Sequence, residues 1–233
     1  PFLTTTIDSS AYLDLPSFEK RKHFVTIGNL LHAPNVDSIL LLKKEIWPGI
    51  RKQIPEAEMH VYGAYAPQLI NELHSEKDNF LIKGWAGDVS EIMKSAKICL
   101  APLRFGAGLK GKFIDAMING TPSITTSIGV EGLAGDFPFS GIVSDDIDEL
   151  VQASVKLYTD RKEWLKHQEN GIIIINQRFN KPTFSKEFRS YLNKLLNAKE
   201  KHRNRNFIGK ILQYKTLQST KYMSKWIAEK NKS

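Results

Sequence analysis

The sequence contains a single cysteine, Cys99, so no disulfide can form within the chain. The thiol lies in the apolar run KICLAPL, which predicts a buried, unreactive side chain and suits a reducing compartment. No apolar run approaches the roughly 20 residues that a membrane-spanning helix needs, and no signal peptide is recognisable. The six histidines lack metal-ligand spacing. We therefore expect a cytoplasmic protein without a metal site, rather than a disulfide-rich secreted domain or an integral membrane protein.

Acidic residues are scarce at one end of the chain only. Ten of the 33 lysines and arginines, but two of the 25 aspartates and glutamates, lie in residues 199–233. This segment therefore carries the whole formal net charge of +8, and the rest of the chain is balanced with 23 residues of each sign. The high net charge thus describes the tail and not the globular part.

The basic tail has apolar residues four apart, which share a helix face with lysines between them. The pairs are Phe207/Ile211, Ile208/Leu212, Tyr222/Trp226 and Met223/Ile227. Such a helix can pack on this domain or on a partner domain, or it can lie on an anionic lipid surface. A helix that lies on lipid would place the protein at the periphery of the inner membrane. Nucleic-acid binding is a third reading, but no base-reading motif accompanies the charge, so we expect no nucleic-acid partner.

From His23 onward, short β-rich runs alternate with helical stretches. The runs are HFVTIGN, EMHVYGA, NFLIKGW, KICLAPL, PSITTS and GIVSDD. The helical stretch NVDSILLLKKEIWPGIRKQI is expected to kink or split at Pro48. Asp88 is placed to cap the helix in DVSEIMKSA, and Gly120 with Pro122 ends the helix in KFIDAMING. The alternation predicts an α/β fold with a doubly wound, mostly parallel Rossmann-like sheet and helices on both faces.

The pattern divides the chain into three segments. Residues 1–22 are polar and irregular and are expected to be a linker or the remnant of an upstream region, since the chain begins with Pro1 and not Met. Residues 23–180 contain the alternating pattern and form the Rossmann-like domain. Residues 181–233 form C-terminal helices and the basic tail. The stretches RKEWLKHQENGIIIINQRF and FSKEFRSYLNKLLNAKEK are expected to be two helices that pack on the domain.

A glycine-rich loop follows the fourth run, at the strand-to-helix turn where such sheets bind ligands. Gly106, Gly108 and Gly111 allow backbone N–H groups to approach a ligand closely. A helix starts near Gly111, and Lys110 and Lys112 add two cations beside its positive end. This combination predicts a site for a diphosphate.

One carboxylate lies close to this loop along the chain. Asp115 is three residues beyond Lys112, so the two side chains share a helix face. A carboxylate repels phosphate but readily accepts hydrogen bonds from a diol. Asp115 therefore predicts contact with the ribose of a nucleotide.

Three stretches occur in an order typical of one family. They are FVTIGNLLHAPNVDSILLL, IWPGIRKQIPEAEMHVYG and FLIKGWAGDVSEIMKSAKICLAPLRFGAGLKGKFIDAMINGTPSITTSIGVEGL. Residues 23–180 resemble the C-terminal, donor-binding domain of GT-B glycosyltransferases, specifically the retaining glycosyltransferase family 4 (group 1). The resemblance implies one half of a GT-B fold that binds a nucleotide diphosphate sugar such as a UDP- or GDP-sugar, with no cofactor. The sugar would pass to a sugar or lipid-linked acceptor held by an N-terminal domain.

The resemblance also assigns roles to residues. The positions expected at the donor diphosphate are Gly28, Asn29, Gly106, Ala107, Gly108, Lys110 and Lys112. Asp115 stands at the second glutamate of the family's E-x7-E motif, which holds the ribose hydroxyls. Gly84 and Trp85 follow the third strand, where the family contacts the base through its main chain. Glu131, in GVEGL, either approaches the donor or caps a short helix.

One position departs from the family pattern. The first glutamate of the motif should stand eight residues before Asp115, and that residue is Ala107. The motif therefore names no catalytic residue in this chain. The expected activity is that of a hexosyltransferase-type enzyme represented by its donor half, which binds donor but transfers poorly alone. An epimerase-type enzyme on the same fold and a non-catalytic nucleotide-sugar-binding module are the alternatives.

Overall fold

A computed structural model describes residues 15–231 of the chain, without the side chains of residues 183 and 214–217. The chain divides into a first compact unit that ends at Lys181 and a second that begins at Pro182. The expected linker, residues 1–22, lies outside the described residues up to position 14.

Six parallel strands form one sheet in the first unit, in the order β3-β2-β1-β4-β5-β6. The strands are β1 (Phe24–Ile27), β2 (Met59–Tyr62), β3 (Phe80–Gly84), β4 (Ile98–Ala101), β5 (Ser123–Thr125) and β6 (Gly141–Val143). Each β-rich run of the sequence contains one of them. The winding reverses between β1 and β4, which pair directly. The predicted doubly wound Rossmann-like fold is therefore confirmed, and this switch point is where such sheets bind ligands.

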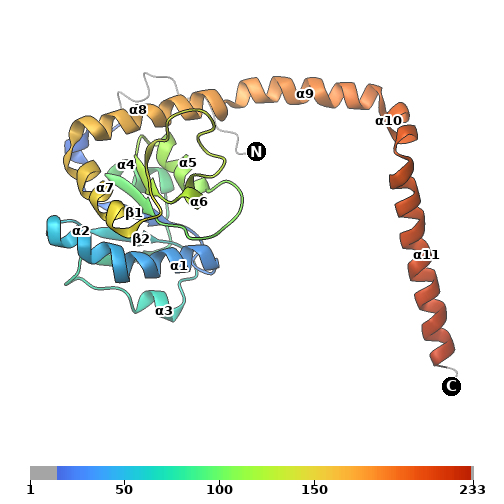
Figure 1. Cartoon of the computed structure of the whole chain (residues 1–233), viewed down its shortest axis with the longest axis horizontal. Coiled ribbons are helices and arrows are strands. Elements are labelled where there is room, and N and C mark those ends of the chain that lie inside the picture. Colours follow the sequence, from blue (N-terminus) through green and yellow to red (C-terminus); the bar gives the residue numbers. More distant parts are fainter. Residues whose placement is uncertain (1–14, 232–233) are drawn as a thin grey trace. The chain divides into compact units, whose positions relative to one another are not determined.

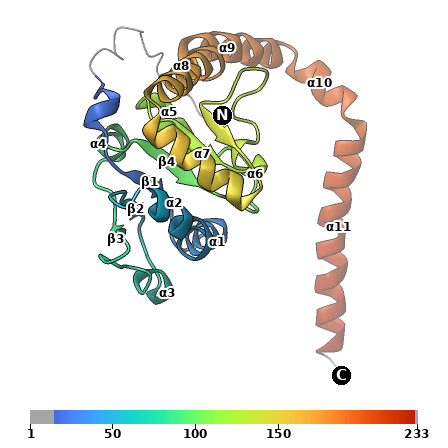
Figure 2. The same ribbon diagram turned by 60° about the vertical axis from the view of Figure 1, so that its left-hand side comes forward.

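Helices cover both faces of the sheet (Figures 1 and 2). One apolar cluster joins the sheet to α1 (Ala33–Leu41), the π-helical segment η3 (Leu42–Ile46), α2 (Trp47–Gln53) and α7 (Ile147–Thr159). A second cluster joins the other face to α4 (Val89–Ser95), α5 (Gly111–Ile118) and α8 (Arg161–Arg178). Alternate residues of β4 belong to the two clusters, because strand side chains point to opposite faces. Two short helices, α3 (Gln68–Asn71) and α6 (Ser127–Val130), lie in loops.

The helix that contains Pro48 continues through the proline rather than breaking there. Proline has no N–H to donate, and its ring would clash with the carbonyl of residue 44 in a regular α-helix. The π-helical segment η3 precedes it, and the Trp47 N–H donates to the carbonyl of Leu42. The wider turn absorbs the proline, so α1, η3 and α2 follow one another without a loop.

Residues 15–22, part of the expected linker or upstream remnant, pack on the domain. A 3₁₀ turn, η2 (Phe18–Lys20), places Phe18 edge-on against Trp164. The buried guanidinium of Arg21 donates to the carbonyls of Met93 and Ala96, both at 3.1 Å, and to the Thr121 hydroxyl at 2.7 Å. These contacts connect the segment to residues about 70 to 100 positions away.

The second unit contains α9, α10 and α11. Their bounds are Lys181–Asn197, Lys199–Arg205 and Phe207–Lys230. Asn206 caps α11, because its side-chain Oδ1 accepts from the Gly209 N–H at 3.0 Å. Among the described residues, no helix has the length and apolar character needed to cross a membrane.

Candidate functional site

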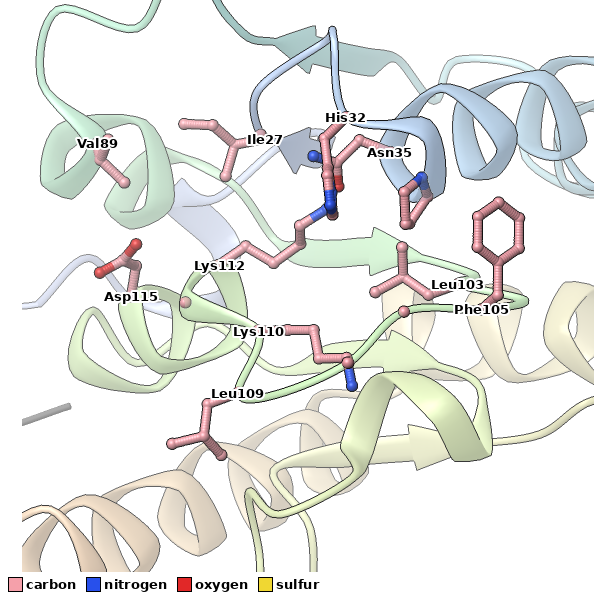
Figure 3. Close-up of a pocket in the computed structure, with 15 residues that line it drawn as sticks. Ile27, His32, Asn35, Val89, Leu103, Phe105, Leu109, Lys110, Lys112 and Asp115 are labelled. Carbon is pink, nitrogen blue, oxygen red and sulfur yellow. The ribbon is translucent and has the colours of Figure 1, made fainter. Parts of the chain in front are cut away.

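A cavity of about 330 Å³ opens beyond the carboxyl ends of β1 and β4 (Figure 3). Because these strands are neighbours at the switch point, the loop after β1 meets the loop after β4 there. Six residues of the predicted site line the cavity: Gly28, Gly106, Ala107, Lys110, Lys112 and Asp115. The fold thus brings together residues that lie up to 87 positions apart in the sequence.

The loop between β4 and α5 has a backbone that suits glycine. Gly106 and Gly108 have φ angles of 142° and 71°, in a region that other residues rarely adopt. Lys110 is the N-cap residue of α5, and its side chain makes no capping hydrogen bond. The first N–H groups of α5 are therefore left for another acceptor, and the helix dipole favours an anion at this end.

Lys112 supplies the cation at the centre of the site. Its ammonium donates to the Asn35 side-chain Oδ1 at 2.8 Å, and no carboxylate of the described residues forms an ion pair with it. Loss of solvent around the ammonium lowers the pKa of Lys112 to about 8. A partly buried ammonium without a carboxylate partner can be stabilised by an anionic ligand.

Asn35 is a residue of the site that the sequence reading did not single out. Its side-chain amide donates to the Asn29 carbonyl at 2.9 Å and accepts from Lys112. It also packs on Gly28, where a Cβ would lie 2.6 Å from the amide nitrogen of Asn35. The amide thus connects the loop after β1 to the lysine of α5. The only signal in the sequence was the PN pair at the start of the first helix.

Lys110 and Lys112 do not point to the same place. In Figure 3 the Lys112 side chain extends toward Asn35 and His32, whereas that of Lys110 points away from them. The buried Lys110 ammonium lies 3.5 Å from the carboxylate of Glu131. Glu131 follows the last residue of α6, whose N-terminus is capped by the Thr126 hydroxyl. Glu131 therefore lies beside the glycine-rich loop through Lys110, and it does not cap the start of α6.

Asp115 is the one acidic residue among those that line the cavity. It is half-buried in α5, and this burial raises the pKa of its carboxyl group. Its side chain projects toward Val89, away from the direction that Lys112 takes (Figure 3). A carboxylate at this end of the cavity can accept hydrogen bonds from hydroxyl groups.

Five residues of the predicted site are outside the cavity lining: Asn29, Gly84, Trp85, Gly108 and Glu131. Asn29 is exposed, and its side-chain oxygen closes a local turn by accepting from the Leu31 N–H at 2.9 Å. Trp85 follows β3 and is 74% exposed. Gly84, the last residue of β3, has a φ angle of 73°, a left-handed conformation that favours glycine. The base contact expected of Gly84 and Trp85 stays a prediction.

Ala107 places a methyl group in the cavity wall where a carboxylate was expected from the family pattern. The nearby Asp37 forms an ion pair with Arg104. Among the described residues, no group of three or more histidine, cysteine or acidic side chains could hold a metal ion. The arrangement can bind an anion and hydroxyl groups.

A parallel Rossmann-like sheet with an anion-accepting loop at its carboxyl edge is the architecture of nucleotide-binding domains. The chain belongs to the family described as glycosyl transferases group 1, whose model matches residues 21–160. No curated protein matches the chain.

Several solved structures share the fold. TarM of S. aureus, solved with UDP, superposes with a TM-score of 0.65 at 15% identity, covering 81% of this chain and 38% of TarM. HepE of Anabaena, in complex with UDP and glucose, superposes with a TM-score of 0.60 at 14% identity. The match covers 76% of this chain and 49% of HepE. Sucrose-phosphate synthase from Thermosynechococcus elongatus superposes with a TM-score of 0.59 at 20% identity. The match covers 84% of this chain and 50% of the synthase. The chain spans half the length of these proteins or less.

Proposed function

We propose that this chain is the donor-binding part of a retaining, family 4 glycosyltransferase and occupies the C-terminal place in a GT-B enzyme. The observation that carries the proposal is the uncapped start of α5 beside the Lys112 ammonium, which has no carboxylate partner in the described structure. Family membership supports transferase chemistry. Solved proteins of the same fold carry UDP or UDP-glucose, so UDP is the nucleotide to test first.

The proposed roles follow from charge and position. When a sugar leaves its donor, the bond between the anomeric carbon and the diphosphate breaks, and negative charge grows on the diphosphate. Lys112 and the N–H groups at the start of α5 stabilise that charge. Asp115 accepts hydrogen bonds from the ribose hydroxyls, and the main chain of Gly84 and Trp85 contacts the base. Lys110 acts on the same diphosphate when it exchanges Glu131 for the ligand.

The methyl group of Ala107 favours a second candidate, a donor-binding module without catalysis of its own. Under the first proposal, transfer needs an acceptor-binding domain, and the isolated chain turns over donor slowly. Under the second, no donor is consumed even when such a domain is present. A nucleotide-sugar epimerase would instead convert donor without any acceptor.

Calorimetric titration with UDP, GDP, ADP and their sugar conjugates tests the proposal, with Lys112→Ala as the variant. We expect one nucleotide class to bind and Lys112→Ala to weaken it by about 10- to 100-fold, the range for a lost charge-assisted hydrogen bond. Lys166→Ala is the control, because this exposed lysine lies in α8 and pairs with Glu163. Binding by none of the nucleotides, or equal binding by wild type and Lys112→Ala, would refute the proposal.

A further inference from the structure

The last helix of the second unit, α11, has exposed apolar side chains near both of its ends. Their exposed fractions run from 38% to 71%, and the residues are Phe207, Ile208, Ile211, Leu212, Tyr222, Met223, Trp226 and Ile227. The middle of the helix, from Gln218 to Lys221, is polar. So much apolar surface on one helix indicates a partner, because large exposed apolar patches mark interaction sites.

The apolar groups at the two ends share one side of the helix. Ile208 and Trp226 are about five turns apart, and Leu212 and Met223 are about three turns apart. Each pair therefore points in nearly the same direction. Lys215 and Lys230 lie within this side and Lys225 at its edge, whereas Lys210 and Lys221 lie on the opposite side. The helix thus has an apolar side that includes two lysines and has a third at its edge.

The charge of α11 has one sign. Its sequence contains five lysines and a single acidic residue, Glu229. The ammonium of Lys230 lies 5.2 Å from the centre of the Trp226 ring. Because residues 199–233 carry all of the net charge, the helix presents a cationic surface next to its apolar side. An anionic surface with an apolar interior complements both features.

The pattern is poorly suited to a helical protein partner. A coiled coil needs apolar residues at a and d positions over three or more heptads. Here the register that contains Ile208, Tyr222 and Trp226 also contains Lys215, Ser219 and Glu229. Lysine is also depleted at protein–protein interfaces, whereas tryptophan, tyrosine and lysine together are typical of helices at the membrane–water boundary.

We propose that α11 lies in the interface of an anionic membrane, with its apolar side in the lipid and the ammonium groups of Lys215, Lys225 and Lys230 extended to the headgroups. The helix adsorbs and does not span, which agrees with the absence of a membrane-spanning helix among the described residues. The cavity of the first unit plays no part in this proposal. Membrane binding can therefore be tested independently of donor binding.

Vesicle flotation of the full chain tests the proposal, with phosphatidylcholine alone and with about one third phosphatidylglycerol. We expect flotation with the anionic vesicles only. The variant that carries Ile208→Gln, Leu212→Gln, Tyr222→Gln and Trp226→Gln keeps the charge, and we expect it to lose on the order of a hundredfold in partitioning. The variant Lys215→Gln, Lys225→Gln, Lys230→Gln should lose a similar factor, about five- to sixfold per lysine. The control, Ser224→Gln with Ala228→Gln on the opposite side, should float like wild type.

Tryptophan fluorescence separates insertion from loose adsorption. Trp47 and Trp164 are buried, so in a Trp85→Phe background the exposed tryptophan is Trp226. We expect its emission to shift to the blue with anionic vesicles and to be quenched by brominated lipid. Unchanged emission, or equal flotation of wild type and the apolar variant, would overturn the proposal. Light scattering that shows a dimer through α11, or binding of nucleic acid without binding of vesicles, would overturn it in favour of that partner.

Discussion

Raising the pH from 7 to 9 should weaken the binding of a nucleoside diphosphate about tenfold, because Lys112 loses its proton in the free chain. Burial lowers the pKa of this lysine from 10.5 to about 8. The diphosphate selects the protonated ammonium and raises this pKa, so binding above pH 8 takes up a proton. The dissociation constant is therefore multiplied by 1 + 10^(pH − pKa), where the pKa is that of Lys112 in the free chain. That factor is about 1.1 at pH 7 and about 11 at pH 9.

Calorimetry with UDP at pH 7, 8 and 9 measures this effect. Repeating each titration in two buffers of different ionisation enthalpy gives the proton uptake, which should approach about 0.9 per site at pH 9. Lys112→Arg is the matched control, since a guanidinium stays protonated and its profile should lack this decrease. The comparison also cancels the titration of the nucleotide itself. In Asn35→Asp, a carboxylate beside Lys112 should raise the pKa of the lysine and move the decrease to higher pH. Parallel profiles for wild type and Lys112→Arg would refute the reasoning.

Three further predictions concern ribose recognition and stability. Wild type should bind UDP about five- to tenfold tighter than 2′-deoxy-UDP, and Asp115→Ala should remove most of that preference in the same titration. Burial and the stacked ring of His60 lower the pKa of His23 to about 4, so the neutral form is favoured in the fold and stability falls as pH drops from 6.5 toward 4. In urea unfolding, the free energy of unfolding of wild type should be about 2–3 kcal/mol lower at pH 4.5 than at pH 7.5, and His23→Phe should lack this decrease. An equal decrease in wild type and His23→Phe would contradict the prediction. Arg21→Met should cost about 3 kcal/mol or more at pH 7.5 by leaving buried carbonyls without donors, against less than about 1 kcal/mol for the exposed Arg161→Met; similar costs would contradict this role.

The fold could be predicted because its signals are local. Apolar runs bounded by glycine and proline located all six strands, and Asp88 caps α4 by accepting from the Ser90 N–H at 2.8 Å. Gly120 ends α5 with a φ angle of 64°. Each of these features depends on residues within one turn of the chain.

The features that the sequence did not indicate depend on distant pairs. Asn35 meets Lys112 across 77 positions, and Arg21 meets Thr121 across 100. Nothing local distinguishes Asn35 from any asparagine at the start of a helix, and a polar residue such as Arg21 is ordinarily exposed. The directions of Lys110 and Lys112 likewise follow from packing, which spacing along one helix could not supply.

The central claim is that the loop from Gly106 to Lys112 holds the diphosphate of a nucleotide sugar. A crystal structure of the chain with UDP or the best-binding nucleotide tests it most directly. We predict the diphosphate at the start of α5, with an oxygen about 2.8 Å from the Lys112 ammonium and the ribose hydroxyls at Asp115. A nucleotide bound elsewhere on the chain, or bound in this cavity with its diphosphate turned away from Lys112, would contradict the account.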